Sequence, residues 1–468
     1  MDNNNIITFL SIFRNLVIRN QIFKEILEFK TTSTSKPPLR YIRGESLIDH
    51  IRGGDLLVIG IFSLDWSFIK HYLPLVQDVS LDIQCKAISQ YCMRLHANHN
   101  TVEQLLKWSR DYQPVSLSSP NNTIMLDYII GKTGNLDIAQ LLLERFPNLK
   151  ISYKAFDWAS SNGHLENLIW LTNNQRIGCT VSAMDDAAKN GHLNIVHYLD
   201  KTRVEGCTTN AIDNASLNGH LNIVKYLIEN RIEGCTIEAM NNCAKNDHFM
   251  IFKYLHEKGF NCNEKAMNYC CLNGNLEFLK FIHLNRTEGC SFLAMDNASK
   301  NGHLDILKYL KLNRTEGCKD AMEYAMSNGY LDIVVWLHQN MNQEPMTVYV
   351  VAPARNGHLD IVEWIFKHYP DRIGSVVMDA AASRGQLHIV QWLHQNNGTV
   401  GCSKNAMDMA IQWLHQYRSE GCTSQAVINA IFGQHLDTII WLFENRTECD
   451  PEQAYKTAIN MNFQSIKY

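Results

Sequence analysis

Cysteine and histidine recur at regular intervals along the chain, and both residue types can ligate a metal ion. The cysteines of one column follow one another at nearly equal intervals and are Cys179, Cys207, Cys235, Cys262, Cys290 and Cys318. The histidine column consists of His164, His192, His220, His248, His303, His358 and His435. The sequence contains no Cys-x-x-Cys pair, which would supply half of a zinc site. We therefore expect no metal and no other cofactor, and we interpret the cysteines as small apolar residues and the histidines as packing residues.

Charged residues form two further columns. The acidic column consists of Asp185, Asp213, Asp296, Asp379 and Asp408. Paired carboxylates could bind Ca²⁺ or carry out acid/base chemistry, but one carboxylate per repeat predicts a hydrogen bond to the next loop instead. The second column pairs an arginine with a glutamate two positions later, at Arg203, Arg231, Arg286, Arg314, Arg418 and Arg446. Alternating opposite charges predict a surface ladder between neighbouring repeats, in which each pair contributes little.

Aromatic residues occupy one position of the repeat and could in principle stack on the bases of a single-stranded nucleic acid. They are Trp170, Tyr198, Tyr226, Tyr254, Tyr309, Trp336, Trp364, Trp392, Trp413 and Trp441. The column lies between aliphatic residues of a predicted helix, which favours a place in the core. The chain has 43 Lys and Arg against 47 Asp and Glu, a net charge of −4. That balance predicts no nucleic-acid partner and no binding to an acidic membrane.

The columns share one period of about 28 residues, which lies in the range of known repeat architectures. The glycine of an Asn-Gly-His-Leu phrase marks it at Gly163, Gly191, Gly219, Gly302 and Gly357. In one repeat Ala211, Ile212 and Ala215 predict a short helix with one buried face, and Gly219 ends it. A second helix follows over Leu221–Leu227. Two helices of this length cannot bury their apolar faces alone, so the repeats must stack.

The phrase Gly-His-Leu-x-Ile-Val-x-x-Leu after an Ala-rich helix resembles the ankyrin repeat. The wording of the repeat also resembles the short-period ankyrin families of amoebae and their giant viruses. The ankyrin period is about 33 residues, so the missing residues shorten the loop that usually forms a β-hairpin. We therefore expect an all-α, ankyrin-like solenoid of helical hairpins with shortened β-hairpin loops.

We expect a division near residue 121. Residues 1–121 are interpreted as an N-terminal helical cap region with degenerate repeats, including an apolar helix at 6–29 and a linker at 31–38. Residues 122–468 are interpreted as about twelve ankyrin-like repeats. One of these repeats has lost its inter-helix turn near Ala410, within 402–422.

No nucleotide loop, nucleophile elbow or kinase signature is present. We therefore expect a non-enzymatic scaffold, a monomeric array that binds unknown protein partners on an extended repeat surface. The position after the acidic column varies between repeats and is the predicted contact surface: Asp186, Asn214, Asn242, Tyr269, Asn297 and Tyr324. An unconstrained solvent-facing position is the alternative interpretation of that variation.

Other functions stay open. The chain could be a substrate adaptor of a ubiquitin ligase that docks through its N-terminal helices, or a decayed array without a specific partner. No positive charge precedes the apolar run Ile6–Phe13, and no window of 18 apolar residues exists. A cytoplasmic location, or a nuclear one, is expected.

Overall fold

A computed structural model describes residues 50–52, 54, 56–114, 125–175, 177–346, 349–396 and 425–432. The predicted helix at 6–29, the linker at 31–38 and the shortened repeat near Ala410 lie outside these residues. The members of the repeated columns beyond residue 396 lie outside them as well.

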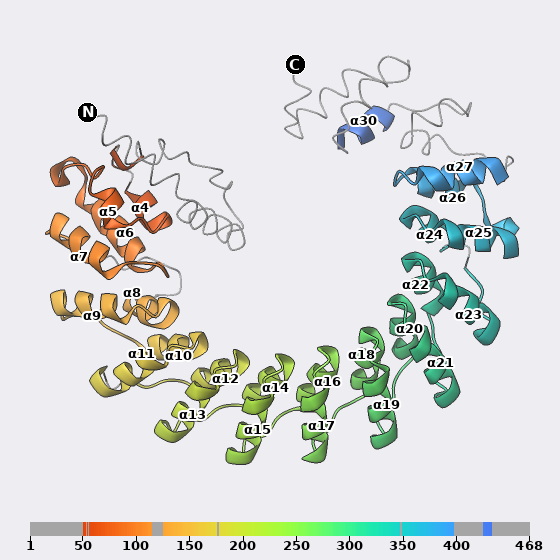
Figure 1. Cartoon of the computed structure of the whole chain (residues 1–468), viewed down its shortest axis with the longest axis horizontal. Helices are drawn as coiled ribbons and strands as arrows, with labels where there is room; N and C mark the ends of the chain where they lie inside the picture. Colours follow the sequence, from red (N-terminus) through yellow and green to blue (C-terminus); the bar gives the residue numbers. More distant parts are fainter. Residues whose placement is uncertain are drawn as a thin grey trace. The chain divides into compact units, whose positions relative to one another are not determined.

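Helices make up all of the regular structure in the described ranges, which contain no β-strand, so the predicted all-α repeat solenoid is confirmed (Figure 1). Two compact units can be distinguished, Met1–Thr236 and Ile237–Tyr468, here called unit 1 and unit 2. This division differs from the one predicted near residue 121, which stays a prediction.

Each repeat contributes a first and a second helix. The first helices are α10 (Tyr153–Asn162), α12 (Ser182–Lys189), α14 (Asn210–Leu217), α16 (Ile237–Lys245), α18 (Lys265–Asn273), α20 (Leu293–Lys300), α22 (Ala321–Asn328), α24 (Val351–Asn356) and α26 (Ser375–Ala382). The second helices are α9 (Leu136–Arg145), α11 (Leu165–Trp170), α13 (Leu193–Thr202), α15 (Leu221–Asn230), α17 (Phe249–Glu257), α19 (Leu276–Asn285), α21 (Leu304–Asn313), α23 (Leu331–Met341), α25 (Leu359–His368) and α27 (Leu387–Asn396). A further helix, α30 (Gln425–Phe432), is isolated among the described residues.

The N-terminal part of unit 1 is also helical. Its elements are α4 (Leu57–Ile61), α5 (Trp66–Ile69), α6 (Leu81–Cys92), α7 (His99–Trp108) and α8 (Met125–Tyr128). Helix α4 packs on α6, and α8 continues into a π-helical turn that packs on α10. The N-terminal helices thus pack helix on helix, as the later repeats do; that they are degenerate repeats stays a prediction.

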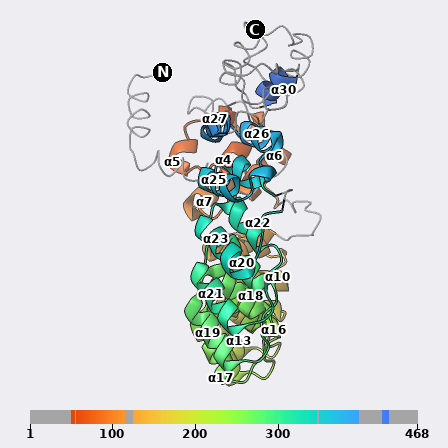
Figure 2. The ribbon, with the colours of Figure 1, turned by 90° about the vertical axis from the view of Figure 1, so that its right-hand side faces the viewer.

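Small residues let the first helices of one unit approach each other closely. In α12, Ala183, Ala187 and Ala188 are buried, and α12 packs against both α10 and α14. The second helices bury longer aliphatic side chains, such as Ile195 and Leu199, and approach one another less closely. The view in Figure 2 shows this stacking in unit 2, where α19 and α21 overlap beside α18 and α20. The face of the first helices is therefore the more tightly curved side of each unit.

Glycine and histidine fix the turn between the two helices. Gly191 adopts a left-handed φ of +84°, which only glycine accommodates without strain. An added Cβ at Gly191 would lie 2.7 Å from Cε1 of His220 in the next repeat. His220 Nε2 lies 3.1 Å from the backbone oxygen of Lys189. The histidine column therefore packs the turn of one repeat onto the turn before it, as the sequence predicted.

The loops between repeats are short. The connection from α13 to α14 runs over residues 203–209 and contains no strand. The shortened loops that the 28-residue period predicts are thus present, and no β-hairpin finger projects from the described repeats.

Candidate partner-binding face

Hydrogen bonds from the acidic column join the first helix of one repeat to the start of the next. Asp185 Oδ1 accepts the backbone N–H of Thr208 at 2.8 Å, and its Oδ2 accepts the Thr208 hydroxyl at 2.6 Å. We call this arrangement the latch. It recurs in unit 1 at Asp127–Ser152, Asp157–Thr180 and Asp213–Thr236. The predicted structural role of this column is confirmed.

The latch carboxyls are largely shielded from water. Asp185 is only 8% exposed, and burial raises its pKa, although the bonds from Thr208 oppose that effect. Burial raises the pKa of Asp127 and Asp157 in the same way. These carboxylates are engaged within the fold, so they do not form the paired acid and base of a catalytic site.

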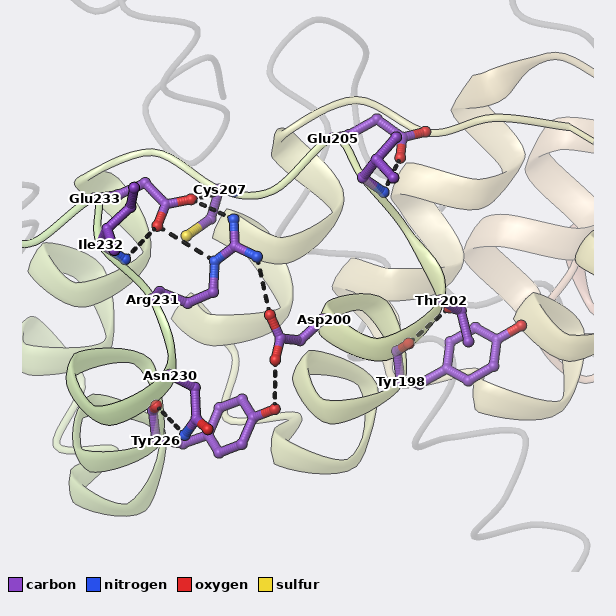
Figure 3. A network of polar contacts seen from close by, with 11 residues as sticks. Tyr198, Asp200, Thr202, Glu205, Cys207, Tyr226, Asn230, Arg231, Ile232 and Glu233 are labelled. Atoms are coloured by element: carbon purple, nitrogen blue, oxygen red, sulfur yellow. Dashed lines mark hydrogen bonds and ion pairs between the residues drawn. The ribbon is translucent and has the colours of Figure 1, made fainter.

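The arginine and glutamate column joins loops to the preceding repeat. In Figure 3, Arg231 reaches Asp200 of the repeat before it at 2.9 Å and Glu233 of its own loop at 2.5 Å. Tyr226 donates its hydroxyl to the same Asp200 at 2.7 Å. The hydrogen bond from Arg231 lowers the pKa of Glu233 to about 2. The predicted ladder is present, with one ion pair inside the loop and one across the repeats.

The cysteine column lies beside this ladder. Cys179, Cys207 and Cys235 are free thiols that are buried or partly buried, and burial raises their pKa to about 12. A thiol that stays protonated is a poor nucleophile and a poor metal ligand. No group of three or more His, Cys, Asp or Glu in the described part of the chain is placed to hold a metal ion.

The aromatic column is not part of the core, which corrects the sequence interpretation. Tyr198, Tyr226 and Trp364 are only partly buried, whereas the fully buried positions of the second helices hold aliphatic or phenylalanine side chains. The column lies between adjacent second helices, where Tyr198 donates to Thr172 of the preceding repeat at 2.8 Å. A hydroxyl that needs a polar partner keeps such a ring at the edge of the core.

The predicted contact residues share one position on consecutive first helices. Asp186 and Asn214 lie on α12 and α14 of unit 1, and the others lie on α16, α18, α20 and α22 of unit 2. These side chains are half-buried, except that of Tyr324, which is exposed. Asn297 donates its side-chain amide to the backbone oxygen of Asn268 at 3.1 Å, so it serves packing as well.

Neighbours on the same helix surface were missed by the sequence analysis. Residues spaced i, i+4 and i+7 share one helix face, and in α18 these are Lys265, Tyr269 and Leu272. We call the corresponding surface of all first helices in a unit its first-helix face. An alignment of the repeats at the 28-residue period would have identified these flanking positions.

One small pocket lies elsewhere, in unit 1. It has a volume of about 210 Å³ and is lined by His99, Asp137, Gln140, Leu141 and Glu144 of α7 and α9. These residues form neither a nucleophile with its base nor a metal centre. In the described part of the chain, no helix is long and apolar enough to span a bilayer.

Solved structures similar to this chain include pentatricopeptide repeat proteins. PPR10 in complex with an 18-nt psaJ RNA element is 10% identical, with a TM-score of 0.42, over 98% of this chain and 79% of that chain. PPR10 from maize is 11% identical, with a TM-score of 0.35, over 99% and 79% of the two chains. At these TM-scores the likeness carries no argument about the ligand of this chain. No curated protein matches the sequence.

Two of these similar structures are complexes with RNA, and the expectation that this chain has no nucleic-acid partner does not stand. The net charge of −4 was the basis of that exclusion. Net charge averages over the whole chain, whereas phosphate binding depends on local groups of cations. The exclusion of nucleic acid is therefore withdrawn.

The family comparison concerns the centre of the array. Residues 184–266 match the family model of ankyrin repeats, in three copies. The match begins in α12 and ends in α18, and its repeats have the first helix, the left-handed turn (at Gly191, Gly219 and Asp247) and the second helix already described. Residues 184–266 are thus similar to a region of three ankyrin repeats.

Proposed function

We propose that the chain is a non-enzymatic scaffold that binds a protein partner on the first-helix face. The observation that carries the proposal is the contrast within each first helix. In α18, Ala266, Met267 and Asn268 are buried, and Tyr269 beside them is partly exposed. Side chains held on rigid stacked helices lose little conformational entropy on binding, which favours association.

Two tyrosines are the strongest contact candidates. Tyr269 and Tyr324 occupy the variable position on α18 and α22, and Tyr324 is 36% exposed. Tyrosine is enriched among the residues that dominate binding energy at protein interfaces. The resemblance to ankyrin families of amoebae and giant viruses remains part of this proposal and suggests where a partner should be sought.

Affinity capture tests the scaffold function. The full chain is expressed in a eukaryotic cytosol, and co-purifying proteins are identified by mass spectrometry for wild type and for Y269A/Y324A. We expect a stoichiometric partner whose recovery falls at least about tenfold with the double variant, as for the loss of interface hot spots.

The matched control is Y254A/Y309A, which changes two partly buried tyrosines on second helices of the same unit. Thermal unfolding followed by circular dichroism establishes that each variant is folded. Equal capture by wild type and Y269A/Y324A would remove the first-helix face from consideration.

The ligase-adaptor alternative depends on docking by the helix predicted at 6–29, which lies outside the described residues, and no described contact favours it.

A further inference from the structure

Every second first helix from α16 to α24, in the described part of unit 2, carries a cation in its last turn. The residues are Lys245 in α16, Lys300 in α20 and Arg355 in α24, and each is separated from the next by two repeats. The helices between them, α18 and α22, carry Leu272 and Ser327 at the same position. The three cations are exposed.

The fold does not require these cations. A positive charge at a helix C-terminus is favourable by a few tenths of a kcal/mol, yet Leu272 and Ser327 occupy the same place in equally well-formed helices. Some other cations of this unit form ion pairs, such as Arg286 with Glu288 and Lys265 with Glu238. By contrast, Lys245, Lys300 and Arg355 form no ion pair with any residue that the structure describes.

Tyrosine fills the alternate repeats. Tyr269 and Tyr324 lie three positions before Leu272 and Ser327, one turn away on the same helix face. Lys300 Nζ lies 5.6 Å from the centre of the Tyr324 ring, so a cation of one repeat reaches the aromatic ring of the next. In unit 1 the same relation joins Lys132 to Trp158 at 5.2 Å. Cationic and aromatic positions therefore alternate along the first-helix face of unit 2.

The repeat spacing converts this alternation into a length. Stacked helices lie about 10 Å apart, so cations two repeats apart are separated by about 20 Å. An extended polypeptide advances about 3.3 Å per residue, and a polyproline-II segment about 3.1 Å. About six residues of an extended segment therefore span the distance between two successive cations, and about three reach the tyrosine between them.

We propose that the first-helix face of unit 2 binds an extended acidic segment of a partner protein. The segment has carboxylates about six residues apart, opposite Lys245, Lys300 and Arg355, and an apolar side chain midway between them, against Tyr269 or Tyr324. This inference rests on the proposed scaffold function and names the chemistry of its partner.

Acidic groups that flank the cations along the chain restrict where such a segment lies. Glu238 and Asp320 lie at the starts of α16 and α22, at the end opposite the cations. Asp305, Asp332 and Asp360 lie in the first turns of second helices, where each accepts the backbone N–H of the following residue. Repulsion from both groups confines a negative segment to the row of cations between them.

The spacing favours a peptide over a nucleic acid. A nucleic-acid strand carries one charge per nucleotide, about 3.4 Å apart along each strand of a duplex. Such a strand would meet a cation only at every second repeat, with carboxylates such as Asp332 alongside. A peptide can place its charges at the longer interval and leave the positions between them neutral.

Peptide selection on the immobilised full chain tests the proposal. The displayed library contains random peptides of about 16 residues, which are long enough to span all three cations. Among the selected peptides, we expect pairs of acidic residues about six positions apart to be enriched at least about tenfold over pairs about three positions apart. A tenfold enrichment corresponds to ~1.4 kcal/mol. The triple variant K245E/K300E/R355E should lose these peptides and should select Lys or Arg at the same spacing.

A matched control makes the same charge change elsewhere. The variant K308E/K311E/K367E alters three exposed lysines on second helices α21 and α25 of unit 2, and its selected peptides should match those of wild type. Selected sequences without acids, acids without preferred spacing, or equal loss in both triple variants would each overturn the proposal.

Two further measurements separate this inference from the scaffold function. A single-stranded RNA probe that binds wild type but not K245E/K300E/R355E, when no acidic peptide is selected, would assign the row to nucleic acid and overturn the proposal. A captured protein partner that depends on Tyr269 and Tyr324, in the absence of acidic peptides, would leave the scaffold function standing and reject only this partner chemistry.

Discussion

The latches of unit 1 are uniform, whereas those of unit 2 are varied. In unit 1 each described latch pairs an aspartate with a serine or threonine, as Asp185 does with Thr208. In unit 2, Asn241 accepts only one bond, from the Asn263 backbone at 3.3 Å. Asn268 exchanges two bonds with Ser291, one in each direction. The same junction between repeats is thus made by different chemical groups in the two units.

One latch of unit 2 is incomplete. Asp296 Oδ1 accepts the backbone N–H groups of Lys319 and Asp320, at 3.0 and 3.1 Å. Its Oδ2 is buried and has no hydrogen-bond partner among the described residues, because lysine stands where unit 1 has a hydroxyl. A buried carboxylate oxygen without a partner costs free energy. Each of these junctions thus keeps a bond to the backbone, whereas the bond to a hydroxyl is absent at Asn241 and Asp296.

Deleting a complete latch should produce the largest loss of stability. Asp185→Ala removes two hydrogen bonds to a charged group and leaves the Thr208 amide unpaired, so we expect a loss of about 3 kcal/mol in the free energy of unfolding. Asn241→Ala removes one long bond and should cost about 1 kcal/mol. Urea unfolding of the full chain, followed by circular dichroism, measures both.

Asp186→Ala is the matched control, because Asp186 follows Asp185 on the same helix and is partly exposed. Its loss should stay within about 0.5 kcal/mol. Equal losses for the two aspartates would show that the latch does not hold the repeats together.

Completing the defective latch should have a smaller, opposite effect. Lys319→Thr supplies a hydroxyl to the unpaired Oδ2 of Asp296, so we expect a gain of about 1 kcal/mol in unfolding free energy. Lys319→Ala removes the same charge without adding a hydroxyl. If both variants gain equally, removal of the lysine explains the change and the latch does not.

The smallest expected effect is a difference in pH dependence between latches made by aspartate and latches made by asparagine. The raised pKa of Asp157 and Asp185 means that protonation favours the folded state. Their contribution is therefore complete below the unfolded pKa and is lost as the pH rises through the folded pKa. Lowering the pH from 7 towards the unfolded pKa of about 3.9 should stabilise the latches formed by Asp157 and Asp185, whereas Asn241 and Asn268 do not titrate.

Hydrogen exchange, corrected for intrinsic rates, can compare the Thr208 and Ser291 amides over this interval. We expect protection of the Thr208 amide to rise more as the pH falls. Asp185→Asn should abolish that rise. The lowered pKa of Glu233 has the opposite effect, but its stabilisation is lost only as the pH falls towards about 2, below this interval. An unchanged rise in Asp185→Asn would contradict the assignment.

Much of the fold could be predicted because the same sequence signals recur in each repeat. The glycine that ends the first helix, the alanines that bury it and the aspartate that reaches the next loop all recur at one period. Gly219, with φ of +83°, and the Asp185–Thr208 bonds agree with that interpretation. The prediction that the aromatic column lies in the core was wrong. The aliphatic neighbours of the column indicated a buried position, but the Tyr226 hydroxyl bonds to Asp200 of another repeat, a contact that the sequence of one repeat does not show.

The sequence by itself determined the order, length and type of the helices, the position of each turn and the residues that face a neighbouring repeat. These features depend on local periodicity and backbone preference within a single repeat. The tertiary structure alone decided which groups meet across repeats. Arg231 and Asp200 belong to different repeats, as do Lys300 and Tyr324, and only stacking brings the members of each pair together. The tertiary structure also decided which cations stay unpaired, because only the packing of neighbouring helices determines whether an acidic group lies close enough to form an ion pair.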